Sequence, residues 1–216
     1  MNKPGQIPVW DWPVRIFHWL IVLHVPILWW TAENDLMEQH RAAGYVVLGL
    51  VLFRLIWGFV GSSTARFSGF VKGPRAILSY LKGKAPDALG HSPLGGWSVL
   101  AMLALLALQV TLGLFAIDVD GMEAGPLSTY VSFDAARAAA DWHGDMFDIL
   151  LVLIGLHIAA ILFYAVARRT NLVRPMLSGR TAARPGVAPM RHVPAWRFFA
   201  SAGAAAAAAA GIAYLA

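Results

Sequence analysis

Two histidines on one long apolar segment are the residues of this chain best placed to do chemistry. His143 and His157 are fourteen residues apart within residues 142–167. At about 100° per residue, fourteen steps return almost to the starting direction, so a helix presents both imidazoles on one face. A rise of about 1.5 Å per residue separates them by roughly 21 Å, most of the hydrocarbon thickness of a bilayer. In a membrane, one helix would therefore carry a nitrogen ligand near each surface.

The composition supports a membrane-spanning protein. Hydrophobic residues make up 58% of the 216 and charged residues 13%, whereas a soluble domain is nearer one half and one quarter. Long apolar stretches predict four spans, at 13–31, 40–61, 95–117 and 142–167, and an alanine-rich fifth at Phe198–Ala216. The first span lacks a small-residue cleavage site, so we interpret it as a retained helix rather than a signal peptide.

The charges of the loops predict the orientation. Short basic loops stay cytoplasmic. The connection 61–94 carries five basic residues against the single acid Asp87, and the connection 168–197 carries seven arginines and no acid. The connections 32–41 and 118–141 are acidic and are expected to face outward. The N-terminus is then cytoplasmic, and the net charge of +5 reflects loop placement rather than a nucleic-acid surface.

This orientation gives the depth of each histidine. The first span runs outward and the second inward, which places His18 near the cytoplasmic surface and His40 near the outer one. The fourth span also runs inward, so His143 matches His40 in depth and His157 matches His18. Imidazoles on both faces of a planar macrocycle give six-coordinate iron, which exchanges single electrons and has no open position. The four histidines therefore predict two bis-histidine haems.

Two alternatives to haem were weighed. A single membrane histidine is more often a hydrogen-bonded interior group, but four at two matched depths are hard to obtain from independent packing needs. Tetrahedral zinc is disfavoured because no third or fourth ligand accompanies either pair. The chain has no cysteine, which excludes thiolate metal sites, iron–sulfur clusters and covalent c-type attachment. The haems should therefore be non-covalent.

Three further residues are candidates for holding such a group. Arg54 follows His40 by fourteen residues, at the inner level of the same face, and Arg15 precedes His18 by three. Either arginine suits a haem propionate through charge-assisted pairing, and snorkelling to headgroups is the alternative. Gly44, one turn after His40, would let a flat ring approach the backbone, although helix packing explains it almost as well.

The other histidines receive weaker assignments. His24 lies six residues past His18, about 120° around the helix. We interpret His24 as a core residue, with a proton or quinone pocket as the alternative. His91 and His192 fall in the predicted cytoplasmic loops, where we expect both to be solvated.

Several strings in these segments resemble the prokaryotic cytochrome b-561 family, which includes the membrane cytochrome b subunit of nickel–iron hydrogenases. They are VWDWPVRIFHW at 9–19, HRAAGY at 40–45, GHSPLGGW at 90–97, WHGDMFDILLVLIGLH at 142–157 and NLVRPMLSGR at 171–180. The similarity covers roughly residues 8–180. It implies a four-helix bundle in the bacterial inner membrane with two b haems, whose ligands would be His18, His40, His143 and His157.

The resemblance also implies partners. Members are similar in passing electrons between the quinone pool and a periplasmic cytochrome or a membrane-bound dehydrogenase or hydrogenase subunit. One branch resembles a superoxide oxidase, which passes electrons from superoxide to ubiquinone. The acidic outer loops would attract a basic protein and oppose an anionic substrate, which favours the electron conduit. Quinone is expected near the GHSPLGG turn and Arg15. A non-redox transporter or scaffold is the remaining reading, and the chain shows no serine-triad, Walker or dinucleotide-binding motif.

The expected fold is all-α. Residues 1–180 should form a transmembrane four-helix haem-binding bundle, and residues 181–216 an Arg- and Pro-rich linker followed by a fifth, alanine-rich transmembrane helix. Alanine is the best helix former and allows helices to approach closely. A peripheral helix is the alternative, against which the absence of a polar face counts. The linker is expected to contact lipid and to have no core of its own.

Overall fold

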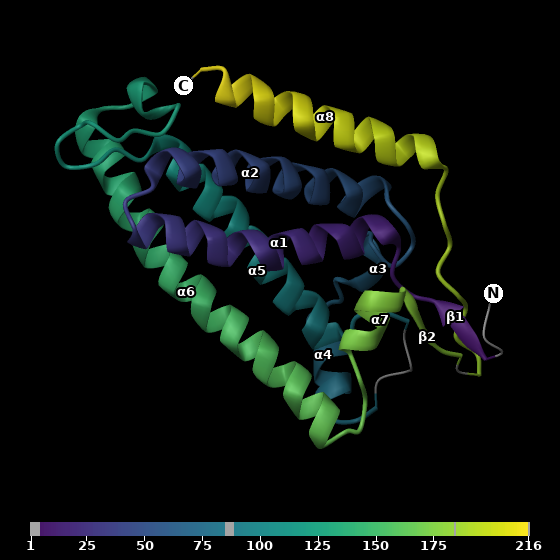
Figure 1. The fold of residues 1–216 in the computed structure, drawn as a ribbon. Helices are drawn as coiled ribbons and strands as arrows, with labels where there is room; N and C mark the ends of the chain where they lie inside the picture. The colour runs from purple at the N-terminus through teal and green to yellow at the C-terminus, as the bar shows by residue number, and fades with distance from the viewer. Residues whose placement is uncertain (1–4, 85–88, 184, 216) are drawn as a thin grey trace. The chain divides into compact units, whose positions relative to one another are not determined.

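The computed structural model describes residues 5–84, 89–183 and 185–215, and these are mostly helical (Figure 1). Asp87 and Arg184 of the basic loops lie outside the described residues. In chain order the elements are β1 (Gln6–Pro8), α1 (Trp12–Glu33), α2 (Met37–Val60), α3 (Phe67–Phe70), α4 (Pro74–Leu81), α5 (Pro93–Phe115), the 3-10 turn η1 (Ser128–Tyr130), α6 (Phe133–Val166), α7 (Val173–Ser178), β2 (Arg180–Ala182) and α8 (Ala195–Ala213).

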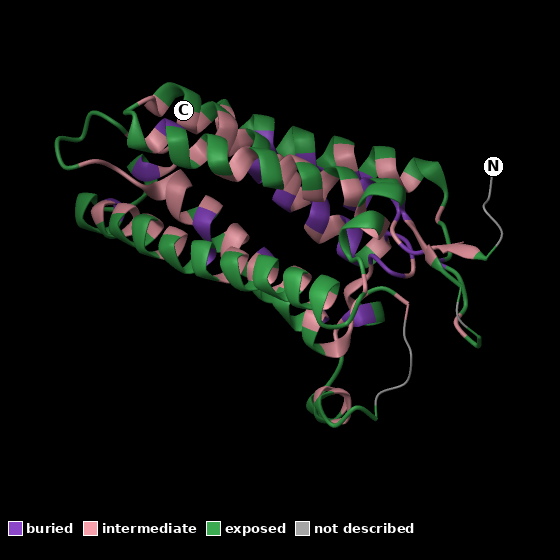
Figure 2. Cartoon of the chain, turned by 60° about the horizontal axis from the view of Figure 1, so that its bottom comes forward, coloured by how far each residue is buried: buried purple, intermediate pink, exposed green. Residues whose placement is uncertain are grey.

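Four of the described helices are long and apolar enough to cross a membrane. They are α1, α2, α5 and α6, which correspond to the four predicted spans. Large apolar side chains stand exposed along them, for example Val152, Leu156 and Phe163 of α6 at 62%, 61% and 58% exposure. Figure 2 shows exposed and half-buried residues along most of the length of the long helices. Such surfaces suit lipid rather than water. The predicted all-α, multi-pass membrane class is confirmed.

One helix begins earlier than the sequence indicated. The apolar stretch predicted a start at residue 142, whereas α6 starts at Phe133. The added residues are rich in alanine, and the Ser132 hydroxyl accepts the backbone N–H of Ala135 at 3.2 Å. Helix propensity and this cap therefore extend the helix beyond the apolar part of the segment.

The alanine-rich tail is helical, as predicted. Ser201, Ala205 and Ala209 of α8 are buried, at a spacing of four residues. A Cβ added at Gly49 of α2 would lie 3.6 Å from the Cβ of Ala209. Small residues on both helices thus allow α8 to pack closely on α2. Because α8 is not among the four candidate spans of the described chain, its crossing of the membrane stays a prediction.

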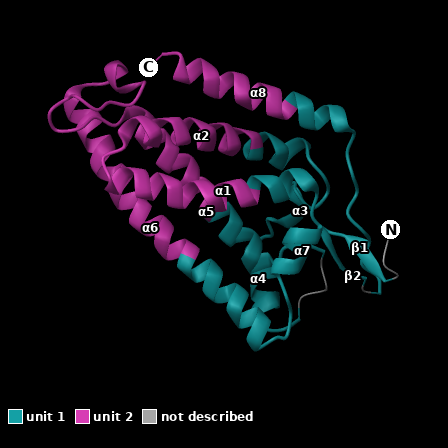
Figure 3. Cartoon of the chain, viewed as in Figure 1, with its two compact units in different colours: residues 1–17, 54–101, 155–200 teal, residues 18–53, 102–154, 201–216 magenta. Residues whose placement is uncertain are grey.

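The chain divides into two compact units (Figure 3). Unit 1 comprises Met1–Phe17, Arg54–Ala101 and Gly155–Ala200, and unit 2 comprises His18–Phe53, Met102–Ile154 and Ser201–Ala216. The boundaries cut α1, α2, α5, α6 and α8, so each unit contains one end of each long helix. Unit 1 also contains both strands and the short helices α3, α4 and α7.

The linker before α8 is attached to unit 1. β1 and β2 pair antiparallel, with Ile7 opposite Thr181. Further along, Met190 is 4% exposed and its N–H donates to Pro8 O at 3.1 Å. Arg191 N–H donates to the Ser63 hydroxyl at 2.9 Å. Backbone pairing that the composition did not indicate therefore joins this stretch to other segments of unit 1 and buries part of it, while its contact with lipid stays a prediction.

Candidate metal centre

The two histidines predicted to lie near the outer surface meet within unit 2. The ring centroids of His40 on α2 and His143 on α6 are 6.1 Å apart, and the ring planes are inclined at 81°. Two imidazole–metal bonds of about 2 Å each, plus roughly 1.2 Å from each ligating nitrogen to its ring centroid, would separate the centroids by about 6.4 Å. The observed spacing therefore fits one metal ion bound between the two rings.

The second nitrogen of each ring is fixed by the backbone. His40 Nδ1 donates to Leu28 O of α1 at 3.0 Å, and His143 Nδ1 donates to Gln109 O of α5 at 2.9 Å. An N–H held by a carbonyl sets the tautomer, so Nε2 of each ring is the nitrogen left for a metal. The helices α1 and α5, which carry neither His40 nor His143, thus orient both imidazole rings.

A glycine on the neighbouring helix leaves space for the His143 ring. A Cβ at Gly113 of α5 would lie 2.9 Å from His143 Cε1, closer than atoms pack, so the ring occupies space that only glycine leaves. Gln109 Nε2 donates to His143 O at 2.8 Å and ties the two helices again. A Cβ at Gly44 would meet no described atom within 4 Å, which gives a flat group room beside His40.

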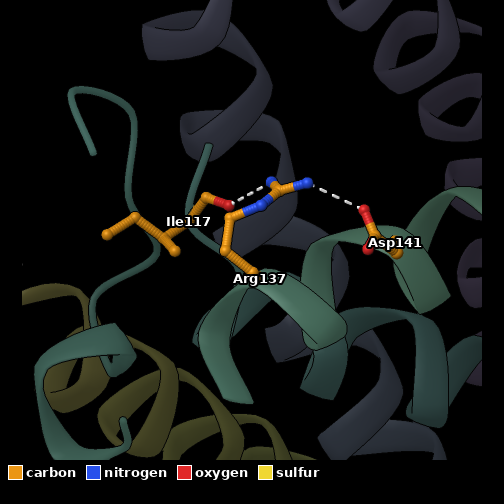
Figure 4. Close-up of polar contacts among 3 residues, drawn as sticks. All are labelled: Ile117, Arg137 and Asp141. Carbon is orange, nitrogen blue, oxygen red and sulfur yellow. Dashed lines mark hydrogen bonds and ion pairs between the residues drawn. The ribbon is translucent and has the colours of Figure 1, made fainter. Parts of the chain in front are cut away.

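The loop that follows α5 is attached to α6 and α2 within the same unit. Arg137 on α6 donates to Ile117 O at 2.7 Å and to Asp141, one turn along, at 2.8 Å (Figure 4). The next loop is attached to α2 by an ion pair between Arg41 and Glu123. The acidic loop after α5, which is predicted to face outward, is therefore held against the helices that carry His40 and His143.

The two histidines predicted to lie near the cytoplasmic surface belong to different units. His18 lies in unit 2 and His157 in unit 1, so their pairing stays a prediction. His24 Nδ1 donates to Leu20 O of its own helix at 2.8 Å, which fits a core residue better than a ligand. In the described part of the chain, no group of three or more histidine, cysteine, aspartate or glutamate side chains is placed to hold a metal ion by itself.

A buried carboxylate that the sequence reading passed over organises unit 1. Asp11 is 6% exposed. One of its oxygens accepts Val14 N–H at 2.9 Å and so caps α1, and the other accepts Trp57 Nε1 at 2.9 Å. Thr64 then donates to Val9 O at 2.7 Å. The signal was the placement of Asp11 directly before the helix, which is typical of an N-cap.

The two candidate arginines differ in their surroundings. Arg15 donates through Nε to Met176 O at 3.2 Å and through Nη2 to Leu177 O, so it holds the end of α7. These bonds explain Arg15 without a propionate. Arg54 is 3% exposed and its guanidinium lies 5.3 Å from the centroid of the Phe67 ring. Its Nη1 has no hydrogen-bond partner in the described structure.

The prediction that His91 is solvated is wrong. Its ring packs against Trp10 and Phe70, with centroids 4.6 and 4.8 Å away, and its Nδ1 is buried. Gly90 has a φ of +88°, which turns the chain so that His91 enters this aromatic site. Burial, reinforced by the charges of Arg54 and His157, lowers the pKa of His91 to about 4. By contrast, His192 is exposed, as expected.

Comparison with known proteins agrees with these features. The chain matches the family prokaryotic cytochrome b561 over residues 9–179. A protein of Azotobacter chroococcum mcd 1 named "Probable Ni/Fe-hydrogenase B-type cytochrome subunit" is 23% identical over 215 residues, with 83% of this chain and 90% of the relative covered. The protein of the same name from Azotobacter vinelandii is 24% identical with the same coverage. No solved structure matches. With four apolar helices, two converging imidazoles and a family match over most of its length, the chain belongs to the prokaryotic cytochrome b561 family, membrane-bound b-type cytochromes that transfer electrons.

Proposed function

We propose that the chain carries electrons across the bacterial inner membrane through two non-covalent b haems, each held by two histidines. The outer haem would be ligated by His40 and His143, and the inner one by His18 and His157. The observation that supports this proposal most is the 6.1 Å separation of the His40 and His143 rings with both Nδ1 atoms bonded to carbonyls. When bound, each haem supplies reversible one-electron chemistry.

The protein's own contribution is to position the ligands and to exclude reactants from the iron. Two imidazoles per iron leave no coordination position for oxygen, so the centre is suited to passing electrons rather than to activating a substrate. The carbonyls of Leu28 and Gln109 hold the rings and make them more basic ligands. The histidine depths derived from the sequence would place one haem near each membrane surface.

The charges of the loops and the names of the relatives support a partner at each end of the electron path. The outer loop presents Asp118, Asp120 and Glu123, and the Arg41–Glu123 pair holds it to α2. An acidic surface near the outer haem attracts a basic protein partner. Because the relatives are named as subunits of a nickel–iron hydrogenase, we propose a hydrogenase- or dehydrogenase-type partner or a periplasmic cytochrome there, and membrane quinone at the cytoplasmic end.

Counting the haems tests the proposal. The purified protein should contain two haems per chain by the pyridine haemochrome assay, with a reduced α-band after dithionite. His143→Ala should lose one haem and keep the other. His24→Ala is the matched control, because His24 bonds within its own helix, and it should keep both. A colourless protein, or a His143→Ala variant that retains both haems, would contradict the proposal.

Superoxide oxidation is the competing function, and the electron donor distinguishes the two. Under anaerobic conditions, a reduced basic cytochrome should reduce the outer haem at a rate that falls steeply with salt, because acidic loops attract it. Superoxide generated enzymatically should react slowly and faster with added salt, because the same loops repel the anion. Fast reduction by superoxide together with salt-independent reaction of the cytochrome would favour the oxidase instead.

A further inference from the structure

Unit 1 contains three buried nitrogen atoms that lack hydrogen-bond partners in the described structure. They are Nη1 of Arg54, Nδ1 of His91 and Nη1 of Arg180, and the first two lie in one aromatic cluster. Arg54 carries a charge and is only 3% exposed. A buried donor without a partner costs about 1–3 kcal/mol, and more when it is charged. The Arg54 and His91 atoms, two such atoms in one cluster, indicate that a ligand supplies the acceptor.

The two side chains belong to one aromatic cluster. The Arg54 guanidinium lies over the Phe67 ring. The centroids of Phe67 and Phe70 are 5.8 Å apart, and those of Phe70 and His91 are 4.8 Å apart. Trp10 covers His91 at 4.6 Å. Apolar rings thus surround both nitrogen atoms and exclude the water that would otherwise satisfy them.

The surrounding charges favour an anion. Arg54 and His157 both interact electrostatically with His91, so the three side chains share one neighbourhood of unit 1. Asp11 is the acid that interacts with Arg54. Its two oxygens accept the N–H groups of Val14 and Trp57. Within the described residues no ion pair joins Asp11 to Arg54. The guanidinium therefore retains capacity for a second negative group.

The chemistry of the two donors indicates a carboxylate. At neutral pH the His91 imidazole is uncharged and has one N–H to donate, while Arg54 offers a charged, planar fork. A carboxylate has two oxygens in one plane and can accept from both, and charge-assisted bonds of this kind are the stronger ones. A quinone carbonyl is neutral and would leave the charge of Arg54 uncompensated.

We propose that Arg54 and His91 together form a carboxylate site for a propionate of the haem ligated by His157. This inference rests on the proposed function, and it gives His91 a role that the sequence did not indicate. A small inorganic anion such as phosphate is a second source of the same chemistry, and the experiment separates the two.

The first measurement is the midpoint potential of the inner haem in the full chain. In a His143→Ala background, which leaves the inner haem alone, Arg54→Gln and His91→Phe should each lower the potential, because a propionate without its partner favours ferric iron. Arg54→Lys keeps the charge and should restore most of the value. Arg75→Gln is the control, because Arg75 is an exposed arginine of the same unit. If this background binds no haem, the proposed function fails; if it binds one whose potential is unchanged in both variants, only the carboxylate site fails.

The second measurement identifies the source of the carboxylate. Full-length protein expressed under haem limitation is reconstituted with protohaem or with its dimethyl ester, which lacks free carboxylates. With protohaem, Arg54→Gln should weaken haem affinity about 10- to 100-fold and His91→Phe about 2- to 10-fold. With the ester, both variants should bind as the unsubstituted chain does. An Arg54→Gln effect that persists with the ester, or that depends on added phosphate, would overturn the proposal, as would a His91→Phe variant altered only in its KM for quinone.

Discussion

Replacing Gly113 by alanine tests whether the outer centre depends on the space beside His143. The new Cβ would lie 2.9 Å from His143 Cε1 and 3.3 Å from Nδ1, whereas ordinary contacts begin at 3.4 Å. The ring must therefore move by about half an ångström, away from the position that bonds Gln109 O. Overpacking of this kind costs about 1–3 kcal/mol. The lost hydrogen bond adds about 1 kcal/mol, which the better helix propensity of alanine offsets by a similar amount.

The net effect should appear as weaker outer-haem binding. About 1–3 kcal/mol corresponds to an affinity roughly 5- to 150-fold lower. Haem titration of the haem-depleted full chain measures it, with the α-band resolving the two centres. Gly203→Ala is the control, because Gly203 lies in the same unit on a helix and its added Cβ would meet no described atom within 4 Å. Equal outer-haem affinity in the two variants would refute the role assigned to Gly113.

Three further outcomes are expected. Asp11→Ala should destabilise the protein by about 2–4 kcal/mol in thermal unfolding, because it removes a helix cap and leaves Trp57 Nε1 unpaired; Asp11→Asn should recover part of this. Arg137→Ala should destabilise the protein by about 1–2 kcal/mol, because the hydrogen bond to Ile117 O contributes about 1 kcal/mol and the ion pair with Asp141, whose side chain is 69% exposed, adds at most about 1 kcal/mol. The haem-free chain should lose about 3 kcal/mol of stability as pH falls from 6.5 to 4, because the unfolded chain then takes up a proton that His91, with its pKa of about 4, excludes. His91→Phe should flatten that pH dependence.

Much of the fold could be predicted because it depends on apolar length and helical periodicity. The four spans follow from stretches long enough to cross a bilayer, and the pairing of His40 with His143 follows from loop charge and rise per residue. The short elements could not be predicted in this way. β1 and β2 are three residues each and far apart in the chain. Neither strand is long enough for an alternating pattern of side chains that would predict its partner strand.

Residues whose surroundings the sequence did not indicate share a different cause, because those surroundings come from distant segments. His91 was expected to be solvated because its own loop is polar, but Trp10 and Phe70 cover it from other parts of the chain. Arg15 suits a propionate by its spacing from His18, and that role stays a prediction, but two carbonyls of α7 also accept hydrogen bonds from Arg15. Spacing predicts the face on which a side chain lies. Spacing does not predict which distant segment packs against that face.

The inclination of 81° between the His40 and His143 rings has a spectroscopic consequence. In the proposed haem, each imidazole would donate π-electron density to the iron orbital perpendicular to its own plane. Parallel rings would raise one of the two such orbitals above the other, whereas crossed rings would affect both equally. The unpaired electron of the ferric form would then be shared between nearly degenerate orbitals. Electron paramagnetic resonance should therefore show a strongly anisotropic low-spin signal for this haem, and its collapse to an ordinary rhombic spectrum would report that one ring has turned.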